Sequence, residues 1–386
     1  MRGQSALGQD DKNMNAKVSV IIPIYNVAPY LARALDSLIY QTIGNLEIIC
    51  IDDASTDGGG DILDAYAAGN KNIIVIKFPK NRGVSAARNA GLERAGGKYV
   101  GFLDPDDYLD RNFYAELFAA ANTADADMAM GNVYYKSRDQ TGTRDDLMAR
   151  VANNKFEFMY CWWAAIYRRQ MLDDNDIKFP DGIICGQDFV FLNRAVVAAN
   201  AVRVVPGTFY HYEMRENSAF SAALSGEKID SQLRARAMLL EFMNAQDLRE
   251  EDYMIVWLAM LKNFLAQLFE RNSNKQTRRL VVRGAIDFYW NAKFRTAAVM
   301  NIRRLNDNLY RFFESRDADG LLEYLIENEK EHTKNQIVEI KWVRIFGLLP
   351  FIKIESFNTK SRRVRLFGLV TVYNILVREE KAAFQI

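Results

Sequence analysis

The sequence has too few histidines and cysteines for several common kinds of site. The only histidines among its 386 residues, His211 and His332, cannot supply a multi-histidine metal centre or an H-E-x-x-H protease motif. Its three cysteines, Cys50, Cys161 and Cys185, form neither a C-x-x-C pair nor an even-numbered disulfide framework, and they fit a reducing cytosol. Carboxylates must therefore supply any acid–base or metal chemistry.

Long apolar runs and an excess of one charge are also missing. The best apolar run, Tyr253 to Leu261, is about half of the ~18 to 20 residues that a membrane-spanning helix needs. A formal net charge of +1 gives no chain-wide basic field, which argues against nucleic-acid binding. Residues 1–16 are polar and lack the apolar core of a secretory signal, so we expect a disordered leader. These features predict a cytoplasmic protein that is soluble or peripheral at a membrane.

The first third of the chain alternates short β-rich runs with helical patterns. Its strands are nearly continuous in Val, Ile and Leu, as strands covered on both faces are. Such alternation predicts an α/β fold with a mainly parallel, doubly wound sheet and ligands at the strands' carboxyl ends. The predicted strands are Val18–Pro23, Leu46–Asp52, Ile73–Phe78, Tyr99–Leu103 and Met128–Asn132, and the predicted helices are Tyr30–Gln41, Gly60–Ala68, Ser85–Ala95 and Arg111–Asn122.

The pattern changes twice further along the chain. A polar stretch at 136–146 predicts an exposed loop, and long helical patterns with few glycines follow a boundary that we place near Ala223. We therefore expect one domain over 17–223 and a helical region over 224–335. The remainder, 336–386, carries the near-repeat FGLLPFIKI and FGLVTVYNI among basic residues. That composition is equally compatible with a membrane-interface anchor and with a helix pair packed on its own domain.

The strand ends carry acidic motifs instead of the usual nucleotide-binding loops. No G-x-G-x-x-G follows the first strand, and no P-loop motif occurs in the chain. Asp52 and Asp53 end the second strand, where a carboxylate can accept from a base N–H or can simply form an Asx-turn or N-cap. Asp104, Asp106 and Asp107 crowd the end of the fourth strand, and their mutual repulsion favours a bound Mg²⁺ or Mn²⁺ ion.

Two arginines flank the start of a predicted helix between these motifs. Arginine is disfavoured at a helix N-terminus, so a diphosphate would explain Arg82 and Arg88. An ion pair between Arg88 and an aspartate at the sheet edge explains that arginine equally well.

Together these segments resemble a known family. The segments VSVIIPIYN, IDDASTDG, NRGVSAARNAG, FLDPDDY and GQDFVF are similar to the successive signatures of bacterial family 2 inverting glycosyltransferases of the surface-polysaccharide type. The resemblance covers Lys17 to about Phe220 and implies the GT-A fold. It also implies a nucleotide-binding half at 17–132 and an acceptor-binding half at 133–223.

The resemblance assigns roles to individual residues. It places Asp188 at the catalytic base, Asp106 on the metal, and Asp104 toward both the ribose and the metal. The sequence has Gly186-Gln187-Asp188 where the family often has G-E-D, so the neighbouring acid is missing. Asp188 is also compatible with an N-cap, and Asp181 is the nearest rival base. The residues implied to bind the nucleotide-sugar are Pro23, Tyr25, Asn26, Asp53, Arg82, Arg88, Asp104 and Arg215.

The implied reaction is a metal-assisted single displacement. Asp188 would deprotonate an acceptor hydroxyl of a glycan or lipid-linked saccharide, while the metal and Arg215 stabilise the leaving diphosphate of a nucleotide-sugar, usually a UDP-sugar. Two alternatives are a catalytically weak glycan- or nucleotide-binding scaffold and a sugar-1-phosphate nucleotidyltransferase. The latter needs a glycine-rich basic loop that Pro23–Asn26 does not provide. We expect His211 to be a packing residue, whereas Trp162 and Trp163 fit either a sugar platform or the core.

Overall fold

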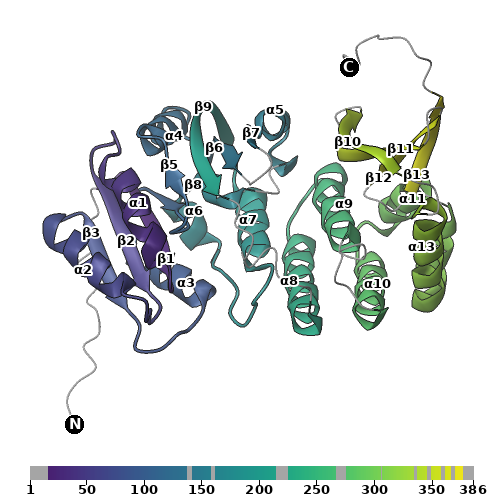
Figure 1. Cartoon of the computed structure of the whole chain (residues 1–386), viewed down its shortest axis with the longest axis horizontal. Coiled ribbons are helices and arrows are strands. Elements are labelled where there is room, and N and C mark those ends of the chain that lie inside the picture. The colour runs from purple at the N-terminus through teal and green to yellow at the C-terminus, as the bar shows by residue number, and fades with distance from the viewer. Residues whose placement is uncertain are drawn as a thin grey trace. The chain divides into compact units, whose positions relative to one another are not determined.

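A computed structural model shows two compact units that follow each other along the chain, with the boundary between Ala222 and Ala223 (Figure 1). Each unit is described separately below. The described residues are 16–136, 141–157, 161–213, 225–266, 275–305, 307–333, 337–345, 349–357, 361–366 and 370–376. The predicted leader therefore lies outside the described residues, apart from Ala16.

The first unit is an α/β domain built on one large sheet. In chain order its elements are β1 (Val18–Ile24), α1 (Ala28–Ile39), β2 (Leu46–Asp52), α2 (Gly59–Gly69), β3 (Ile73–Lys77), α3 (Val84–Arg94), β4 (Tyr99–Phe102), β5 (Tyr108–Leu109), α4 (Phe113–Thr123), β6 (Met128–Lys136), β7 (Thr141–Thr143), α5 (Asp145–Asn153), β8 (Ala165–Arg168), α6 (Arg169–Asp174), α7 (Gln187–Ala198) and β9 (Val202–Glu213). Short 3₁₀ turns lie at Lys155–Glu157 and Trp162–Ala164.

The first half of the sheet is parallel, as the apolar runs predict. Strand β1 lies between β2 and β4 and runs parallel to both, while β3 adds to the far side of β2. Every residue of β1 and β2 is buried, because helices cover the sheet. Helix α3 packs closely on this layer. A Cβ added at Gly91 would lie 2.4 Å from Cγ2 of Ile21, so only glycine fits there.

The second half of the sheet is mixed. Its strand order continues β4-β8-β6-β9-β5, in which β8 runs antiparallel to both neighbours and β9 runs parallel to β6. Parallel pairing therefore joins β1 to β4 and also β6 to β9, whereas β5, β7 and β8 pair antiparallel with their neighbours. Continuous apolar runs explain the difference, because burial on both faces does not specify the direction of a strand.

The prediction of an exposed loop at 136–146 is wrong for the residues that the structure describes there. Strand β6 extends to Lys136, β7 pairs with it, and α5 begins at Asp145. Polar side chains stabilise this region locally, since the Asp145 carboxylate accepts hydrogen bonds from Thr143 Oγ1 and Asn132 Nδ2, each at 2.6 Å. Local bonding of this kind explains how a polar stretch acquires secondary structure.

The second unit contains helices followed by a small sheet. The helices are α8 (Gly226–Ala245), α9 (Glu250–Ala266), α10 (Lys275–Trp290), α11 (Arg295–Leu305), α12 (Asp307–Ser315) and α13 (Ala318–Thr333). Helix α10 contacts α8, α9, α11 and α13, so it lies at the centre of the group. The fully buried ring of Trp257 stacks on Phe288, with ring centroids 5.4 Å apart. No helix in the described ranges is long and apolar enough to cross a membrane.

The last segment forms four antiparallel strands, so the alternative of a C-terminal helix pair is wrong. The strands are β10 (Ile337–Ile345), β11 (Leu349–Phe357), β12 (Ser361–Leu366) and β13 (Val370–Leu376), paired in that order (Figure 1). Strands β11 and β13 come from the two copies of the near-repeat. Alternating branched and basic residues, as in Arg363-Val364-Arg365-Leu366, favour strands because their period is two.

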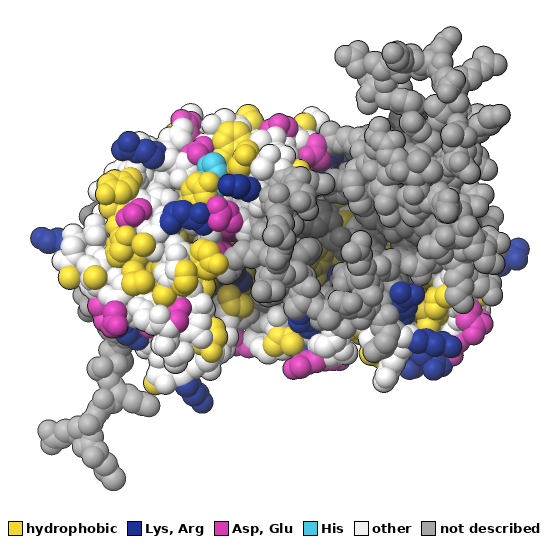
Figure 2. Space-filling view, viewed as in Figure 1, with side chains coloured by type: hydrophobic (Ala, Val, Ile, Leu, Met, Phe, Trp, Pro, Cys, Tyr) yellow, Lys and Arg dark blue, Asp and Glu magenta, His cyan; other side chains and the backbone are white. Residues whose placement is uncertain are grey.

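Charged side chains of both signs are scattered over the surface. On the face shown in Figure 2, Lys and Arg lie among Asp and Glu and do not gather into one basic field. This distribution agrees with the net charge of +1.

Candidate active site

The loops after β1 and β2 are tied together at the carboxyl edge of the sheet. Pro23 is buried within β1, whereas Tyr25 is exposed and Asn26 has a positive φ of 52°. The Asn26 side-chain oxygen accepts a hydrogen bond from the Thr56 N–H at 2.9 Å, and the Asn26 N–H donates to Ser55 Oγ at 3.2 Å. These bonds hold the first predicted nucleotide-binding segment against the second.

The two neighbouring aspartates at the end of β2 have different partners. Asp52 accepts a hydrogen bond from the Ser55 N–H, three residues on, at 2.9 Å, so it stabilises the turn after β2 locally. Asp53 is 3% exposed, and its two oxygens accept from the N–H groups of Arg82 (2.6 Å) and Gly83 (2.8 Å). Asp53 therefore fixes the loop before α3. The Arg82 guanidinium lies over the Phe78 ring, 4.5 Å from its centroid.

Three carboxylates lie together after β4. Asp104 and Asp106 are half-buried, whereas Asp107 is 1% exposed. Asp107 accepts hydrogen bonds from the Tyr210 hydroxyl (2.9 Å) and the Glu213 N–H (3.0 Å). Burial, together with the charges of Asp104 and Asp106, raises the pKa of Asp107 to about 8. At neutral pH the Asp107 carboxyl group is therefore mainly protonated.

Arg88 links this loop to the predicted base. It is 6% exposed, and its guanidinium donates to Asp104 at 3.0 Å while lying over the rings of Trp162 and Phe179. Arg88 therefore forms an ion pair with an aspartate at the sheet edge. Burial raises the pKa of Asp188 above its usual range, and the positive charge of Arg88 lowers it in part. Arg88 thus acts on a carboxylate from each half of the sheet.

Asp188 lies in the first turn of α7. The N-cap of this helix is Gly186, with φ of 93°, so Asp188 is not the cap residue considered as an alternative. Its side chain accepts from the Phe189 N–H at 2.8 Å. The rival residue Asp181 is exposed in a turn. Near Asp188, the side-chain oxygen of Gln187 is buried and has no hydrogen-bond partner among the described residues.

The aromatic candidates divide between the core and the site. Trp162 is 4% exposed and packs against Phe102, Phe179 and Phe191, so it belongs to the core. Trp163 is half-buried beside the rings of Tyr210 and Tyr212, and its buried Nε1 lacks a partner within the described part of the chain.

His211 and Arg215 have different outcomes. His211 stacks on Tyr108 with ring centroids 4.4 Å apart, and its Nε2 lies 2.8 Å from Asp110. These contacts are those of a packing residue. Arg215 lies outside the described residues.

Residues that the motifs do not indicate also contribute to the acidic loop. Tyr210 accepts a hydrogen bond from the Asp104 N–H at 3.1 Å, and Arg33 donates to the Asp106 carbonyl at 2.7 Å. Glu213 binds both Asp107 and Arg33. No local pattern identifies these residues, because they reach the loop from α1 and β9. Asp107 belongs to the acidic motif after the fourth predicted strand, and only its burial in the structure distinguishes it from Asp104 and Asp106.

The donor groups of the loop fit a divalent cation. In the ranges that the structure describes, no group of three or more His, Cys, Asp or Glu side chains is arranged as a metal site. Asp104 and Asp106 nevertheless offer two hard carboxylate donors whose repulsion a cation would relieve. Mg²⁺ and Mn²⁺ suit such donors, and Mg²⁺ commonly takes one or two carboxylates together with phosphate oxygens and water. The pair therefore suits a metal that a phosphate-bearing substrate completes.

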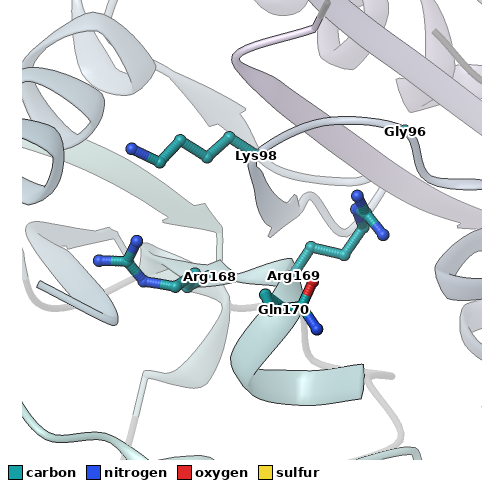
Figure 3. A pocket seen from close by; sticks show the side chains of 5 residues that line it. All are labelled: Gly96, Lys98, Arg168, Arg169 and Gln170. Carbon is teal, nitrogen blue, oxygen red and sulfur yellow. The ribbon is translucent and has the colours of Figure 1, made fainter. Parts of the chain in front are cut away.

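A separate hollow lies at the opposite end of β4. Gly96, Lys98, Arg168, Arg169 and Gln170 line it, and Figure 3 shows the side chains of Arg168 and Arg169 pointing in different directions. Arg168 pairs with Asp125 and Asp127, and Arg169 pairs with Asp173. Since these acids balance the basic charge, we assign no ligand to this hollow.

Comparison with known proteins identifies the family. The model of glycosyl transferase family 2 matches residues 19–197. The chain is 32% identical over 231 residues to the uncharacterized glycosyltransferase YibD of Escherichia coli (strain K12), covering 56% of this chain and 67% of YibD. The chain belongs to glycosyl transferase family 2.

Two relatives from Bacillus subtilis (strain 168) match a smaller share of their own length. The uncharacterized glycosyltransferase EpsJ is 30% identical over 214 residues, which cover 52% of this chain and 62% of EpsJ. The minor teichoic acid biosynthesis protein GgaB is 30% identical over 228 residues, which cover 54% of this chain and 24% of GgaB. The chain thus matches less than two thirds of either relative.

A solved structure has the same fold. The structure of S. aureus TarS 1-349 in complex with UDP superposes with a TM-score of 0.66 at 21% identity, covering 89% of this chain and 97% of that chain. This likeness confirms the predicted α/β fold of the GT-A type.

Proposed function

We propose that the protein is an inverting glycosyltransferase that moves a sugar from a nucleotide-diphospho-sugar to a hydroxyl of a glycan or lipid-linked acceptor. The observation that carries this proposal is the position of Arg88, whose charge acts on Asp104 in the acidic loop and on Asp188 at the start of α7. Family membership supports glycosyl transfer. The name of GgaB supports an acceptor in cell-surface polysaccharide biosynthesis.

Each half of the site has its own task in this proposal. Pro23, Tyr25, Asn26 and Asp53 hold the nucleoside at the edge formed by β1 and β2. Asp104 and Asp106 hold Mg²⁺ or Mn²⁺, which supplies positive charge to the diphosphate when bound. Arg82, and Arg215 in the segment after β9, contact the nucleotide phosphates.

Asp188 accepts the proton of the attacking hydroxyl in this mechanism. Burial raises its pKa toward the working pH, which makes a carboxylate a better general base. Trp163 Nε1 and Gln187 Oε1, a buried donor and a buried acceptor, are available to the hydroxyls of an acceptor sugar. A single base on one side of the donor gives inversion, since the diphosphate leaves from the opposite face.

Release of free nucleotide from a panel of UDP- and GDP-sugars with Mn²⁺ tests this function. UDP-sugars come first, because TarS has been solved with UDP and with UDP-GlcNAc. Asp188→Asn is expected to lower turnover by about 10²- to 10⁴-fold, since it removes the base. Asp106→Ala should remove the dependence on Mn²⁺, whereas the exposed Asp181→Asn should retain activity. Equal loss in Asp181→Asn and Asp188→Asn would contradict the assignment of the base, and pyrophosphate release would indicate a nucleotidyltransferase.

We also propose that the C-terminal sheet contacts anionic lipid at the inner face of the cytoplasmic membrane. Strand register places Lys353 opposite Arg365 and Glu355 opposite Arg363, so three cations occupy neighbouring positions on one face of the β11 and β12 pair. Ile354 and Val364 are paired on the other face, where Lys341 of β10 lies opposite Ile354. Juxtaposed cations of this kind attract anionic headgroups, and each contributes about 1 kcal/mol near the surface.

Sedimentation with phosphatidylglycerol vesicles tests this contact. The triple variant Lys353→Glu, Arg363→Glu, Arg365→Glu is expected to remain in the supernatant while the wild type pellets. A matched control carries Glu at three exposed cations of the helices, Lys275, Arg283 and Arg304. Equal loss of binding in both variants would indicate general attraction, and unchanged binding in the first would exclude these three cations as the lipid contact.

A further inference from the structure

Arg33 makes an unusual set of contacts for a residue on the outside of a helix. It lies in the second turn of α1, and its Nη1 and Nη2 donate to the two Glu213 oxygens at 2.8 and 2.9 Å. Nη2 also donates to the backbone carbonyl of Asp106 at 2.7 Å. The guanidinium lies 4.7 Å from the centroid of the Tyr108 ring. One side chain thus connects α1, the acidic loop after β4 and the end of β9.

These contacts close a ring around Asp106. Arg33 holds the carbonyl of Asp106, and Glu213, which Arg33 binds through its side chain, donates its own N–H to the Asp107 carboxylate at 3.0 Å. The hydrogen bond from Arg33 also lowers the pKa of Glu213, so the pair is charged at neutral pH. Bidentate pairs fix geometry as well as charge. The peptide between Asp106 and Asp107 is therefore held from both sides by residues far away in the sequence.

We propose that Arg33 is a positioning residue that presents the Asp106 carboxylate to the metal of the nucleotide-sugar site. This inference rests on the proposed function, which gives Asp106 its metal. Arg33 contacts neither carboxylate of the Asp104 and Asp106 pair in this arrangement. It acts through the backbone of Asp106 and through Glu213. Partners that orient metal ligands typically change metal affinity by about 10- to 100-fold when they are removed.

This geometry separates two parts of nucleotide binding, the contacts to the nucleoside and the binding that depends on the metal. Among the described residues, the nucleoside part of the site, at Asp53 and the loop that it fixes, shares no hydrogen bond with Arg33. Loss of Arg33 should therefore weaken the binding that depends on metal and leave the rest unchanged. A residue with a purely structural role would lower thermal stability without this division.

Calorimetric titration of UDP, with Mn²⁺ and separately with EDTA, measures the two parts. In Arg33→Lys, which keeps the charge but loses the fork, UDP affinity with Mn²⁺ is expected to fall about tenfold. Glu213→Gln should give a similar fall, and the double variant should be little worse than either single one because both break the same ring. UDP affinity in EDTA should stay within about twofold of the wild type.

Arg169→Lys is the matched control. Arg169 is also partly buried and pairs with an acid, Asp173 at 3.0 Å, but it lies at the opposite end of β4. The control should leave the Mn²⁺-dependent affinity unchanged. If Arg33→Lys and Arg169→Lys lower the melting temperature alike and neither changes the response to Mn²⁺, the positioning role is overturned. A wild-type protein whose UDP binding does not respond to Mn²⁺ would contradict the proposed metal site itself, and the positioning role with it.

Discussion

Replacement of Arg88 by methionine separates the charge of this residue from its packing. Methionine keeps much of the apolar contact with Trp162 and Phe179 and removes the cation that donates to Asp104. Because the charge of Arg88 opposes the effect of burial on Asp188, its loss should raise the pKa of Asp188 further. The variant should therefore change both the stability of the domain and the pH at which the base becomes available.

The magnitudes follow from burial and from the partners. Breaking a fully buried ion pair costs about 3 to 5 kcal/mol. The Asp104 side chain is 29% exposed, so we expect about 2 to 3 kcal/mol, which corresponds to a fall of roughly 4 to 12 °C in the melting temperature of a domain of this size. A nearby opposite charge lowers the pKa of a carboxyl group by about 1 to 3 units. For Asp188 we therefore expect the pKa to rise when Arg88 is lost.

The assay is the pH dependence of kcat/KM for the donor found in the nucleotide-release screen. A carboxylic acid with a raised pKa needs a higher pH to become the base, so the acidic limb should move to higher pH. Arg94→Met is the control, because Arg94 lies on the same helix and pairs with the buried Glu47 at 3.5 Å. It should lower stability and leave the acidic limb in place. An unmoved limb in Arg88→Met would refute the electrostatic link.

Three further predictions concern the supporting structure. Tyr210→Phe removes a hydroxyl that accepts a hydrogen bond from the Asp104 N–H and donates one to the Asp107 carboxylate. The free energy of unfolding, measured with urea, should therefore fall by about 1 to 3 kcal/mol, and an unchanged value would contradict a stabilising role of these two bonds. Asp107 has a pKa of about 8, so in EDTA the stability of the wild type should fall as the pH rises from about 4 to about 8. Asp107→Asn should remove this dependence on pH, and the same dependence in both proteins would contradict the raised pKa of Asp107. Gly91→Ala should cost about 1 to 3 kcal/mol by crowding Ile21, whereas Gly69→Ala, with open space around it, should not destabilise.

Local patterns predict the first half of the sheet well, because the buried residues of each strand there follow one another directly in the sequence. The apolar run at Val18–Pro23 becomes β1 with one added residue, and the run at Leu46–Asp52 becomes β2 without change. Acids that directly follow such strands meet at one edge, which is why Asp53 and Asp104 can be placed from the sequence.

Residues that reach the same loop from far along the chain cannot be predicted in this way. Arg33 has the appearance of an ordinary polar position on an amphipathic helix, and Glu213 gains its role only because β9 returns beside the loop. The C-terminal segment shows a different difficulty. Its basic and apolar residues fit an interfacial anchor by composition, and only the strand register shows which of them lie side by side, as Lys353 and Arg365 do.

The short ladder between β4 and β8 also affects the order in which the two parts of the candidate site form during synthesis. Three residue pairs, from Tyr99 opposite Arg168 to Gly101 opposite Ile166, join the half that carries Asp104 to the half that carries Asp188. Once the first 160 residues have been synthesised, every predicted nucleoside contact is present. Strand β8, which pairs with the outer side of β4, has not yet been synthesised. Asp188 and the residues of β9 that bind the acidic loop, Tyr210 and Glu213, are synthesised only with α7 and β9. The two parts of the candidate site therefore come together only when the first unit is nearly complete.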